Sequence, residues 1–515
     1  MKFFRKHTLI ILSTLFFLTS IYISIYGLFY LTYSKPPNIP FFRSINTSNI
    51  LYRASESLLN SGFGNLYFFN SGVVFNDSPD FVLRFSKKDY EYKDSIRNLI
   101  KSGKVKILED WLKKWRDFEI VVNGEEIDAK FKYHGSSYTP YLQDYESFTV
   151  KSEFPINGYT NFKLINGLET NYFNVFLNLI GHNFNLITED PGRIIVTNSL
   201  GKIQDFFQYN VFDEAYLQSR YGFKNSIILR RNTFWENNNN SKWHSSKLDN
   251  VPYNIDLNYV SNDDYVLWES LLNSTSENNY DPEYIGMFLA LLQLFGSAHQ
   301  ITGNNDKWVI NNGKLYPVYR NESALDPIIN DEININSLFS KYYYSYSLEP
   351  YKSFLGDENV LIERNHAFKK ILDSRINILD ALDSTYNQHI RTHRRYNKKY
   401  LKIKFDHNNK KRVLENNLNK IENYLNSGHS LILFDGEKLK VSSTRKNPIK
   451  VEINGEGFTF LPKRYFYNKE ELSIKDGFDE LIIDNIEVID SLKLYDITLD
   501  KILEVEKDYS ILYIN

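Results

Sequence analysis

Hydrophobic and polar residues follow regular patterns along this chain, and these patterns predict its elements. Short apolar and aromatic runs predict strands at residues 81–85, 118–122, 127–133, 147–151, 194–198 and 206–212, and the run at 147–151 also alternates between apolar and polar residues. Apolar residues at helical spacing predict helices at residues 94–115, 168–184, 284–295 and 359–382. The helix at 284–295 is apolar on nearly every face, which indicates burial on all sides. Asn123-Gly124 lies between two of the strands and favours a hairpin turn.

The pattern changes at residue 400. After a predicted helix at residues 412–425, short strand-like runs follow at residues 431–434, 449–453, 481–483, 492–494 and 511–514. We therefore expect residues 400–515 to form a separate, mostly β domain. The basic run at residues 391–399 is interpreted as a solvated linker, and contact with an anionic polymer or lipid surface is the alternative.

The N-terminal segment predicts a membrane anchor. Residues 8–34 carry no charged side chain, and a membrane-spanning helix needs ~20 apolar residues. Lys2, Arg5 and Lys6 precede this run, so the positive-inside rule keeps the N-terminus cytoplasmic and places the bulk of the chain outside. A cleaved signal peptide is the alternative. The expected organisation is an anchor at 1–34 and a spacer at 35–77, in a single-pass membrane protein.

Composition narrows the class of protein. The 515 residues are enough for two or three domains, and the formal net charge of −2 argues against a nucleic-acid partner. The chain has no cysteine, which excludes disulfides and zinc sites built on thiolates.

Several polar residues suit phosphoryl transfer, which needs a cation on the phosphates, a carboxylate for the attacking hydroxyl and oxygen ligands for Mg²⁺. Lys151 ends a predicted strand, where its ammonium could point into a cleft. Glu169, near the start of the next predicted helix, is placed to pair with Lys151. Glu214 follows the strand at 206–212, where it could meet adenine or ribose. For each of the three, the alternative is a solvated or helix-stabilising charge.

Asp306 and Asn311 have the D-x-x-x-x-N spacing of a kinase catalytic loop, in which the aspartate takes the hydroxyl proton and the asparagine binds a metal. For the second metal position the chain offers only Asn321 or Glu322, and neither is equivalent to an aspartate. In place of a Gly-rich phosphate loop, Gly135-Ser136-Ser137 predicts a turn whose backbone N–H groups and hydroxyls could face phosphate. The predicted cofactors are ATP and Mg²⁺ or Mn²⁺.

Five segments occur in a characteristic order: PDFVLRF (79–85), VVNGEEIDAKFKYHGSS (121–137), SFTVK (147–151), GK-x₆-YNVFDEAYL (201–217) and the D-x-x-x-x-N loop. This order resembles the spore-coat CotH kinase-like family of atypical secretory or surface protein kinases. The resemblance implies that Lys151 is the nucleotide lysine, Asp306 the catalytic aspartate and Glu214 an acidic residue near the nucleotide. The chain departs from the family's pattern at Arg320-Asn321-Glu322-Ser323, which stands in place of a W-D-x-D-like metal site, and at the turn Tyr133-His134-Gly135-Ser136-Ser137, which stands in place of an R-G-N-S-S-like turn.

The expected fold class is α+β, with a reduced kinase-like bilobal domain at 78–395 between a transmembrane helix and the β domain at 400–515. Two functions follow from this interpretation. One is an extracytoplasmic phosphotransferase acting on a surface protein or polymer. The other is a pseudokinase that serves as a cell-surface binding or assembly module, with a surface protein or glycan as partner. A carbohydrate-active or glycan-binding protein is a third hypothesis, suggested only by the many Tyr, Trp and Asn residues.

Overall fold

The structure is a computed structural model that divides into two compact units. The first comprises Met1–Tyr172, Gly192–Gln208 and Leu382–Val413, and the second comprises Phe173–Pro191, Tyr209–Ala381 and Leu414–Asn515. The residues that the structure describes are 13–24 except 15, 18 and 22, then 80–102, 114–134, 147–166, 172–199, 202–231, 253–255, 279–296, 307–319, 325, 327–328, 354, 357–396, 400–428, 430–434, 437–443, 445–460, 479–484, 486 and 488–503.

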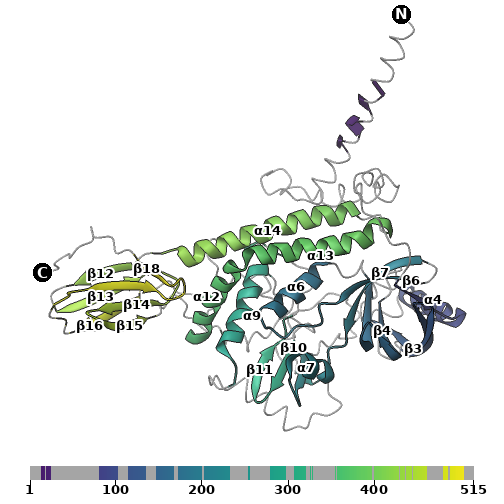
Figure 1. Ribbon diagram of the computed structural model, residues 1–515, viewed down its shortest axis with the longest axis horizontal. Helices are drawn as coiled ribbons and strands as arrows, with labels where there is room; N and C mark the ends of the chain where they lie inside the picture. The colour runs from purple at the N-terminus through teal and green to yellow at the C-terminus, as the bar shows by residue number, and fades with distance from the viewer. Residues whose placement is uncertain are drawn as a thin grey trace, which may run out of the picture. The chain divides into compact units, whose positions relative to one another are not determined.

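A closed barrel forms the framework of the first unit, with the strand order β1-β2-β3-β4-β5-β7-β6 (Figure 1). The strands are β1 (Phe81–Arg84), β2 (Arg116–Val122), β3 (Glu125–Tyr133), β4 (Phe148–Ile156), β5 (Tyr159–Asn166), β6 (Arg193–Ser199) and β7 (Lys202–Asn210). β1 pairs in parallel with β6 and closes the barrel. The sequence predicted six of these strands, and β5 was missed.

Aromatic rings fill the barrel interior. The centroid of Phe131 lies 5.0–5.7 Å from those of Phe85, Phe118 and Phe148, mostly in edge-to-face contacts that add to the stabilisation from burial. Since strand residues alternate between the two faces, each buried ring is followed by an outward-facing polar residue in β3. This alternation decides where the charged side chains of the barrel lie.

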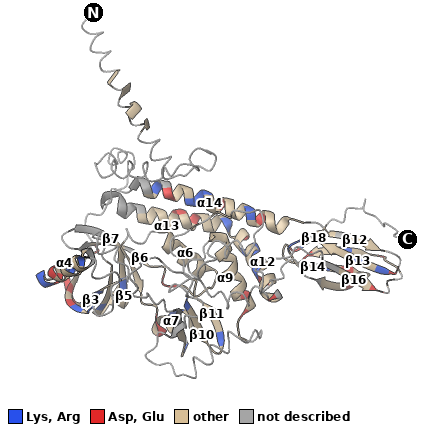
Figure 2. Cartoon of the chain, turned by 180° about the vertical axis from the view of Figure 1, so that it is seen from behind, with Lys and Arg blue, Asp and Glu red and all other residues tan. Residues whose placement is uncertain are grey.

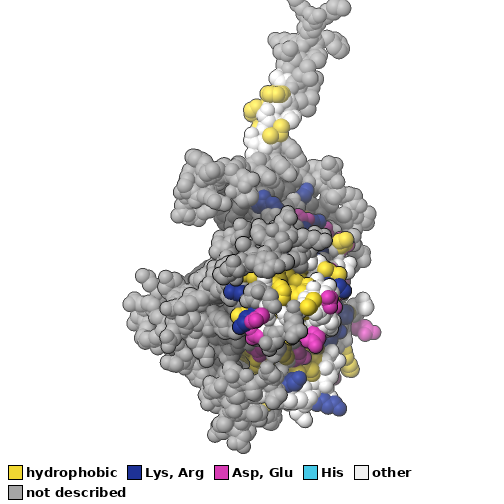
Figure 3. All heavy atoms as spheres, turned by 90° about the vertical axis from the view of Figure 1, so that its left-hand side faces the viewer, with side chains coloured by type: hydrophobic (Ala, Val, Ile, Leu, Met, Phe, Trp, Pro, Cys, Tyr) yellow, Lys and Arg dark blue, Asp and Glu magenta, His cyan; other side chains and the backbone are white. Residues whose placement is uncertain are grey.

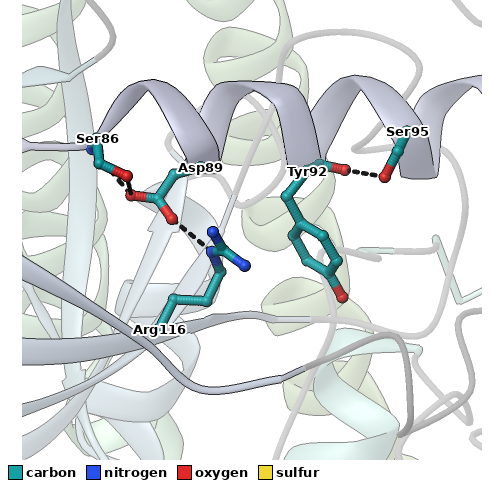
Figure 4. A network of polar contacts seen from close by, with 5 residues as sticks. All are labelled: Ser86, Asp89, Tyr92, Ser95 and Arg116. Carbon is teal, nitrogen blue, oxygen red and sulfur yellow. Dashed lines mark hydrogen bonds and ion pairs between the residues drawn. The ribbon is translucent and has the colours of Figure 1, made fainter.

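Helix α4 (Lys87–Lys101) is fixed to the barrel by a short polar network (Figure 4). The Asp89 carboxylate accepts hydrogen bonds from the backbone N–H and the hydroxyl of Ser86, and it also pairs with the Arg116 guanidinium at the start of β2. The Asp89 side chain thus satisfies the N–H of Ser86 just before the helix, as in one half of a capping box, and the helix starts at Lys87. The prediction that this helix begins at residue 94 is wrong because it overlooked this cap.

Asp89→Asn is expected to lower the free energy of unfolding by about 1–3 kcal/mol near pH 7, because Arg116 loses its buried charged partner. Burial alone would raise the pKa of Asp89, but its hydrogen bonds with Ser86 and Arg116 outweigh burial and lower that pKa below the ordinary 3.8. The stabilisation is therefore complete above the ordinary pKa and is lost as the pH falls through the folded value.

Urea unfolding near neutral pH and in acid measures this effect, and the difference between wild type and variant should shrink in acid. Asp94→Asn is the control, because Asp94 lies on the same helix with an exposed side chain. Equal losses for the two variants would contradict the prediction.

Helices α13 (Arg375–Tyr396) and α14 (Tyr400–Asn426) lie side by side and antiparallel (Figure 1). Ion pairs join them, with 2.6 Å between Lys411 Nζ and Asp383 Oδ2 and 3.3 Å between Arg375 Nη1 and Glu422 Oε2. Two sequence predictions are corrected here. The run at 391–399 was expected to be a linker, but its first six residues complete α13, and α14 begins at residue 400 rather than 412.

The second unit contains a sheet with the strand order β11-β10-β8-β9. Its strands are β8 (Ile227–Arg231), β9 (Tyr253–Ile255), β10 (Lys307–Asn311) and β11 (Lys314–Pro317). Its helices include α6 (Tyr172–Asn183) from Phe173 onward, α7 (Glu214–Tyr221), α9 (Pro282–Phe295) and α12 (Glu358–Asp373). The predicted helix at 359–382 is in fact two helices, because Ser374 caps α12 before α13 begins.

Helix α9 is buried over its whole length from Ile285, which confirms the prediction from its apolar pattern. α9 packs closely on α12 at Gly286, where an added Cβ would lie 2.6 Å from the backbone N of Arg364. Glycine is therefore needed here for close helix packing, although it weakens a helix by about 1 kcal/mol relative to alanine.

Two further sheets follow α14 in the second unit, with the orders β12-β13-β16 and β15-β14-β17-β18. Their strands are β12 (Ser430–Phe434), β13 (Lys438–Ser443), β14 (Ile449–Ile453), β15 (Glu456–Phe460), β16 (Asp479–Asp484), β17 (Leu492–Asp496) and β18 (Lys501–Leu503). These strands agree with the mostly β pattern predicted after residue 425, and the run at 511–514 lies outside the described residues. Figure 3 looks onto the end with these sheets, where hydrophobic side chains lie among charges of both signs.

The predicted fold class needs a correction at the N-terminus. No helix in the described part of the chain is long and apolar enough to cross a membrane. The transmembrane helix is therefore not supported, and the kinase-like bilobal arrangement stays a prediction.

Candidate functional site

Lys151 lies on the outer face of the barrel. Its neighbour in β4, Val150, is fully buried in the barrel core, so the alternation of strand residues turns Lys151 outward. The Lys151 ammonium lies 4.9 Å from the ring centroid of Trp115. The sequence predicts that Lys151 points into a cleft and pairs with the carboxylate of Glu169. Glu169 lies outside the described residues. In the described structure the Lys151 ammonium contacts the indole ring of Trp115.

A second lysine approaches the same ring. The Lys132 ammonium lies 5.1 Å from the Trp115 centroid, and Lys130 is directly opposite Lys151 across β3 and β4. Lys130 is paired in turn with Asp117 of β2 at 3.6 Å. We call the surface formed by Trp115, Lys130, Lys132 and Lys151 the lysine face.

The edge of the lysine face carries two further hydrogen-bonding groups. His134 Nδ1 lies 3.2 Å from the hydroxyl of Thr149, which is the cross-strand partner of Lys132. The His134 backbone N–H donates to the carbonyl of Ser147 at 2.8 Å, and this bond extends the pairing of β3 with β4 beyond the strand ends. This side of the barrel therefore combines cations, an aromatic ring and polar groups in one region.

Asn311 has a structural position that its sequence spacing did not reveal. It ends the buried strand β10, and its amide Nδ2 donates to the carbonyl of Lys224 at 2.9 Å and to the hydroxyl of Ser226 at 3.0 Å. The side chain thus holds the segment that follows α7. The expectation of a catalytic loop is wrong for residues 307–311, because these residues form a strand paired with β8 and β11.

Glu214 is the exposed first residue of α7, where a carboxylate favours the positive end of the helix dipole. The preceding Asp213 caps the helix by accepting the N–H of Tyr216 at 2.9 Å. Asn311 contacts residues beyond the other end of α7, about 12 Å away along eight helical residues. The structure therefore does not bring Glu214 and Asn311 together.

The other predicted site residues lie outside the described part of the chain. They are Gly135, Ser136, Glu169, Asp306, Asn321 and Glu322. Among the residues that are described, no group of three His, Asp or Glu side chains could hold a metal ion. The predicted roles of these residues in binding ATP and Mg²⁺ or Mn²⁺ stay predictions.

Sequence reasoning missed a buried ion pair next to β10. Lys307 Nζ lies 2.6 Å from Glu189 Oε1, and both side chains are almost fully enclosed. The backbone carbonyl of the neighbouring Thr188 accepts hydrogen bonds from the hydroxyl groups of Tyr216 and Tyr221, at 3.2 and 3.3 Å. Burial raises the pKa of Tyr216 far above its ordinary value, so this hydroxyl stays a neutral donor. These contacts fix the segment before β6 and indicate a structural role.

The α13–α14 pair contains an Asp–His pair that could resemble part of a catalytic triad. His407 Nε2 lies 3.0 Å from Asp383 Oδ1, and the His407 ring stacks on Tyr386 with centroids 3.8 Å apart. Burial lowers the pKa of His407, although Asp383 opposes this shift, so the imidazole is neutral near pH 7. Because His407 is buried between the helices, we interpret the pair as part of their packing.

Comparison with known proteins adds no assignment. No protein-family model matches this chain, and no curated protein is significantly similar to it. The resemblance to the CotH kinase-like family therefore rests on the five sequence segments alone.

Proposed function

We propose that this protein is a binding or assembly module rather than a phosphotransferase. The observation that carries the proposal is the position of Asn311, which is 5% exposed at the end of β10. The hydrogen bonds that its Nδ2 donates to the carbonyl of Lys224 and the hydroxyl of Ser226 hold the side chain in this buried position. A metal ligand in phosphoryl transfer needs an oxygen presented to a solvent-accessible phosphate site, and this environment does not favour one.

The surroundings of Lys151 support the same proposal. Phosphoryl transfer depends almost entirely on positioned charges, so its lysine must be held toward the phosphates by a partner carboxylate. In the described structure the Lys151 ammonium is instead held over Trp115 on the outer face of the barrel. A cation in such a position can bind an anion at a surface, which is a recognition role.

Thermal unfolding of the full chain with and without ATP and Mg²⁺ or Mn²⁺ tests the proposal. A ligand that binds only the folded state at a hundredfold excess over its Kd stabilises it by about 2.7 kcal/mol. We expect no metal-dependent stabilisation at millimolar nucleotide. Lys151→Ala is compared with Lys87→Ala, a control at an exposed lysine of the same unit. A metal-dependent stabilisation that Lys151→Ala abolishes and Lys87→Ala retains would overturn the proposal.

A further inference from the structure

The lysine face places like charges together at a cost in stability. Lys130 and Lys151 are direct cross-strand partners, and like charges in such pairs destabilise a sheet. Asp117 compensates Lys130, but among the described residues no carboxylate lies within ion-pairing distance of Lys132 or Lys151. An anionic ligand would remove this repulsion, so the arrangement favours anion binding.

Trp115 gives the lysine face a second means of recognition. Trp115 is 37% exposed, so part of its surface meets solvent beside the two ammonium groups. Each ammonium gains about 0.5–1 kcal/mol from an exposed aromatic face, which is enough to orient the lysine but leaves its charge available to a stronger partner. Burial of the indole by a ring-shaped ligand would add apolar contact area.

We propose that the lysine face binds an acidic sugar. The apolar C–H face of a pyranose ring would pack on the indole of Trp115. A carboxylate, sulfate or phosphate on the same sugar would accept charge-assisted hydrogen bonds from Lys132 and Lys151. The two ammonium groups lie 5.1 and 4.9 Å from the indole centroid, so an acidic group on a sugar that packs against the exposed part of the indole would have both cations nearby.

The charge pattern of the barrel argues against a long polyanion such as single-stranded nucleic acid. Glu119 and Asp128 are cross-strand partners on β2 and β3, two residues along from the pair Asp117 and Lys130. This distance is about 7 Å, so an extended polyanion that leaves the lysine face would meet carboxylates. Figure 2 shows both signs of charge on α4 and the neighbouring barrel strands. A short ligand with one or two charges avoids this repulsion.

This inference rests on the proposed binding role and names the ligand class. The two tests remain distinguishable, because the first reads nucleotide-dependent stability and the second reads sugar affinity at Trp115. If nucleotide stabilises the protein and the lysine face still binds sugar, only the proposed function is overturned. If nucleotide has no effect and no sugar binds, only this inference is overturned.

Isothermal titration calorimetry of the full chain tests the inference with four probes. These are hexagalacturonate, a sulfated heparin hexasaccharide, neutral maltohexaose and a six-nucleotide oligothymidylate. We expect at least one acidic hexasaccharide to bind about tenfold or more tightly than maltohexaose and oligothymidylate. Comparison of the uronate with the sulfated probe identifies which acidic group is preferred.

Variants locate the binding site. The double variant Lys132→Gln/Lys151→Gln should weaken acidic sugar binding by about tenfold or more, and Trp115→Ala by a similar factor. Lys87→Gln/Lys88→Gln removes the same charge from exposed positions of α4 and should leave affinity within about twofold. Circular dichroism establishes that each variant is folded.

Three results would overturn the inference. The first is no acidic sugar binding at millimolar probe, and the second is tighter binding of oligothymidylate than of either acidic sugar. The third is an equal loss in the lysine-face and α4 double variants, which would indicate unspecific charge attraction.

Discussion

Replacing Trp308 by alanine is expected to lower the free energy of unfolding of the second unit by about 3–5 kcal/mol. Trp308 lies in the middle of the sheet, with no exposed surface, on a strand hydrogen-bonded on both sides to β8 and β11. Its ring also packs on Phe354 at a centroid distance of 6.0 Å. The substitution leaves a large cavity that the paired strands cannot close by moving together.

Trp115→Ala is the matched control, because it deletes the same side chain at an exposed position of the first unit. We expect a loss of less than about 1 kcal/mol for that variant, which is the scale of surface substitutions and exposed cation–π contacts. Urea unfolding followed by circular dichroism measures both variants. Similar losses at the two positions would show that β10 is not part of a tightly packed core.

The Asn-Gly pairs of the chain show how much of the fold could be read from the sequence. All four described turns of this type join adjacent antiparallel strands, and both residues of each have positive φ: Asn123-Gly124, Asn157-Gly158, Asn312-Gly313 and Asn454-Gly455. This conformation suits the right-handed twist of a hairpin. Only the first was used as a hairpin signal, so β5, β10 and β15 were missed although their turn signals were present.

The segment before Asn312-Gly313 shows why a functional motif misled the sequence analysis. The run Trp308-Val309-Ile310 is apolar and lies one residue before the turn, which is a strand signal. The D-x-x-x-x-N spacing of Asp306 and Asn311 instead predicts a loop over the same residues. Asparagine is frequent in the chain, so a motif that specifies only two residues is easily matched by chance. A turn signal next to an apolar run is therefore the more informative pattern.

The surroundings of Lys151 could not be derived from local patterns. Alternation indicates that Val150 and Lys151 face opposite sides of a strand, but it does not identify the ring over which the lysine lies. Trp115 reaches Lys132 and Lys151 because β2, β3 and β4 are neighbours in a closed barrel. Register and barrel closure are properties of long-range pairing, which a single sequence does not reveal.

Lys307→Met is the second substitution with a large expected effect, a loss of about 3–5 kcal/mol in unfolding free energy. The Lys307 and Glu189 side chains are 4% and 13% exposed, so removal of the lysine leaves a carboxylate in a largely dry environment. The double variant Lys307→Met/Glu189→Leu removes the buried carboxylate together with the ammonium group and should lose less than the single variant.

The pair of Lys370 with Glu283 shows that burial, not distance, decides the size of this effect. Its atoms are 2.5 Å apart, close to the 2.6 Å of the buried pair, but its side chains are 53% and 65% exposed. Lys370→Met should therefore lose only about 0–1 kcal/mol, since solvent screens the remaining carboxylate. Chemical denaturation at equal ionic strength measures the free energy of unfolding of the three variants and of the wild type. A loss for Lys307→Met as small as that for Lys370→Met, or a double variant as unstable as the single one, would mean that Glu189 regains solvent when its partner is removed.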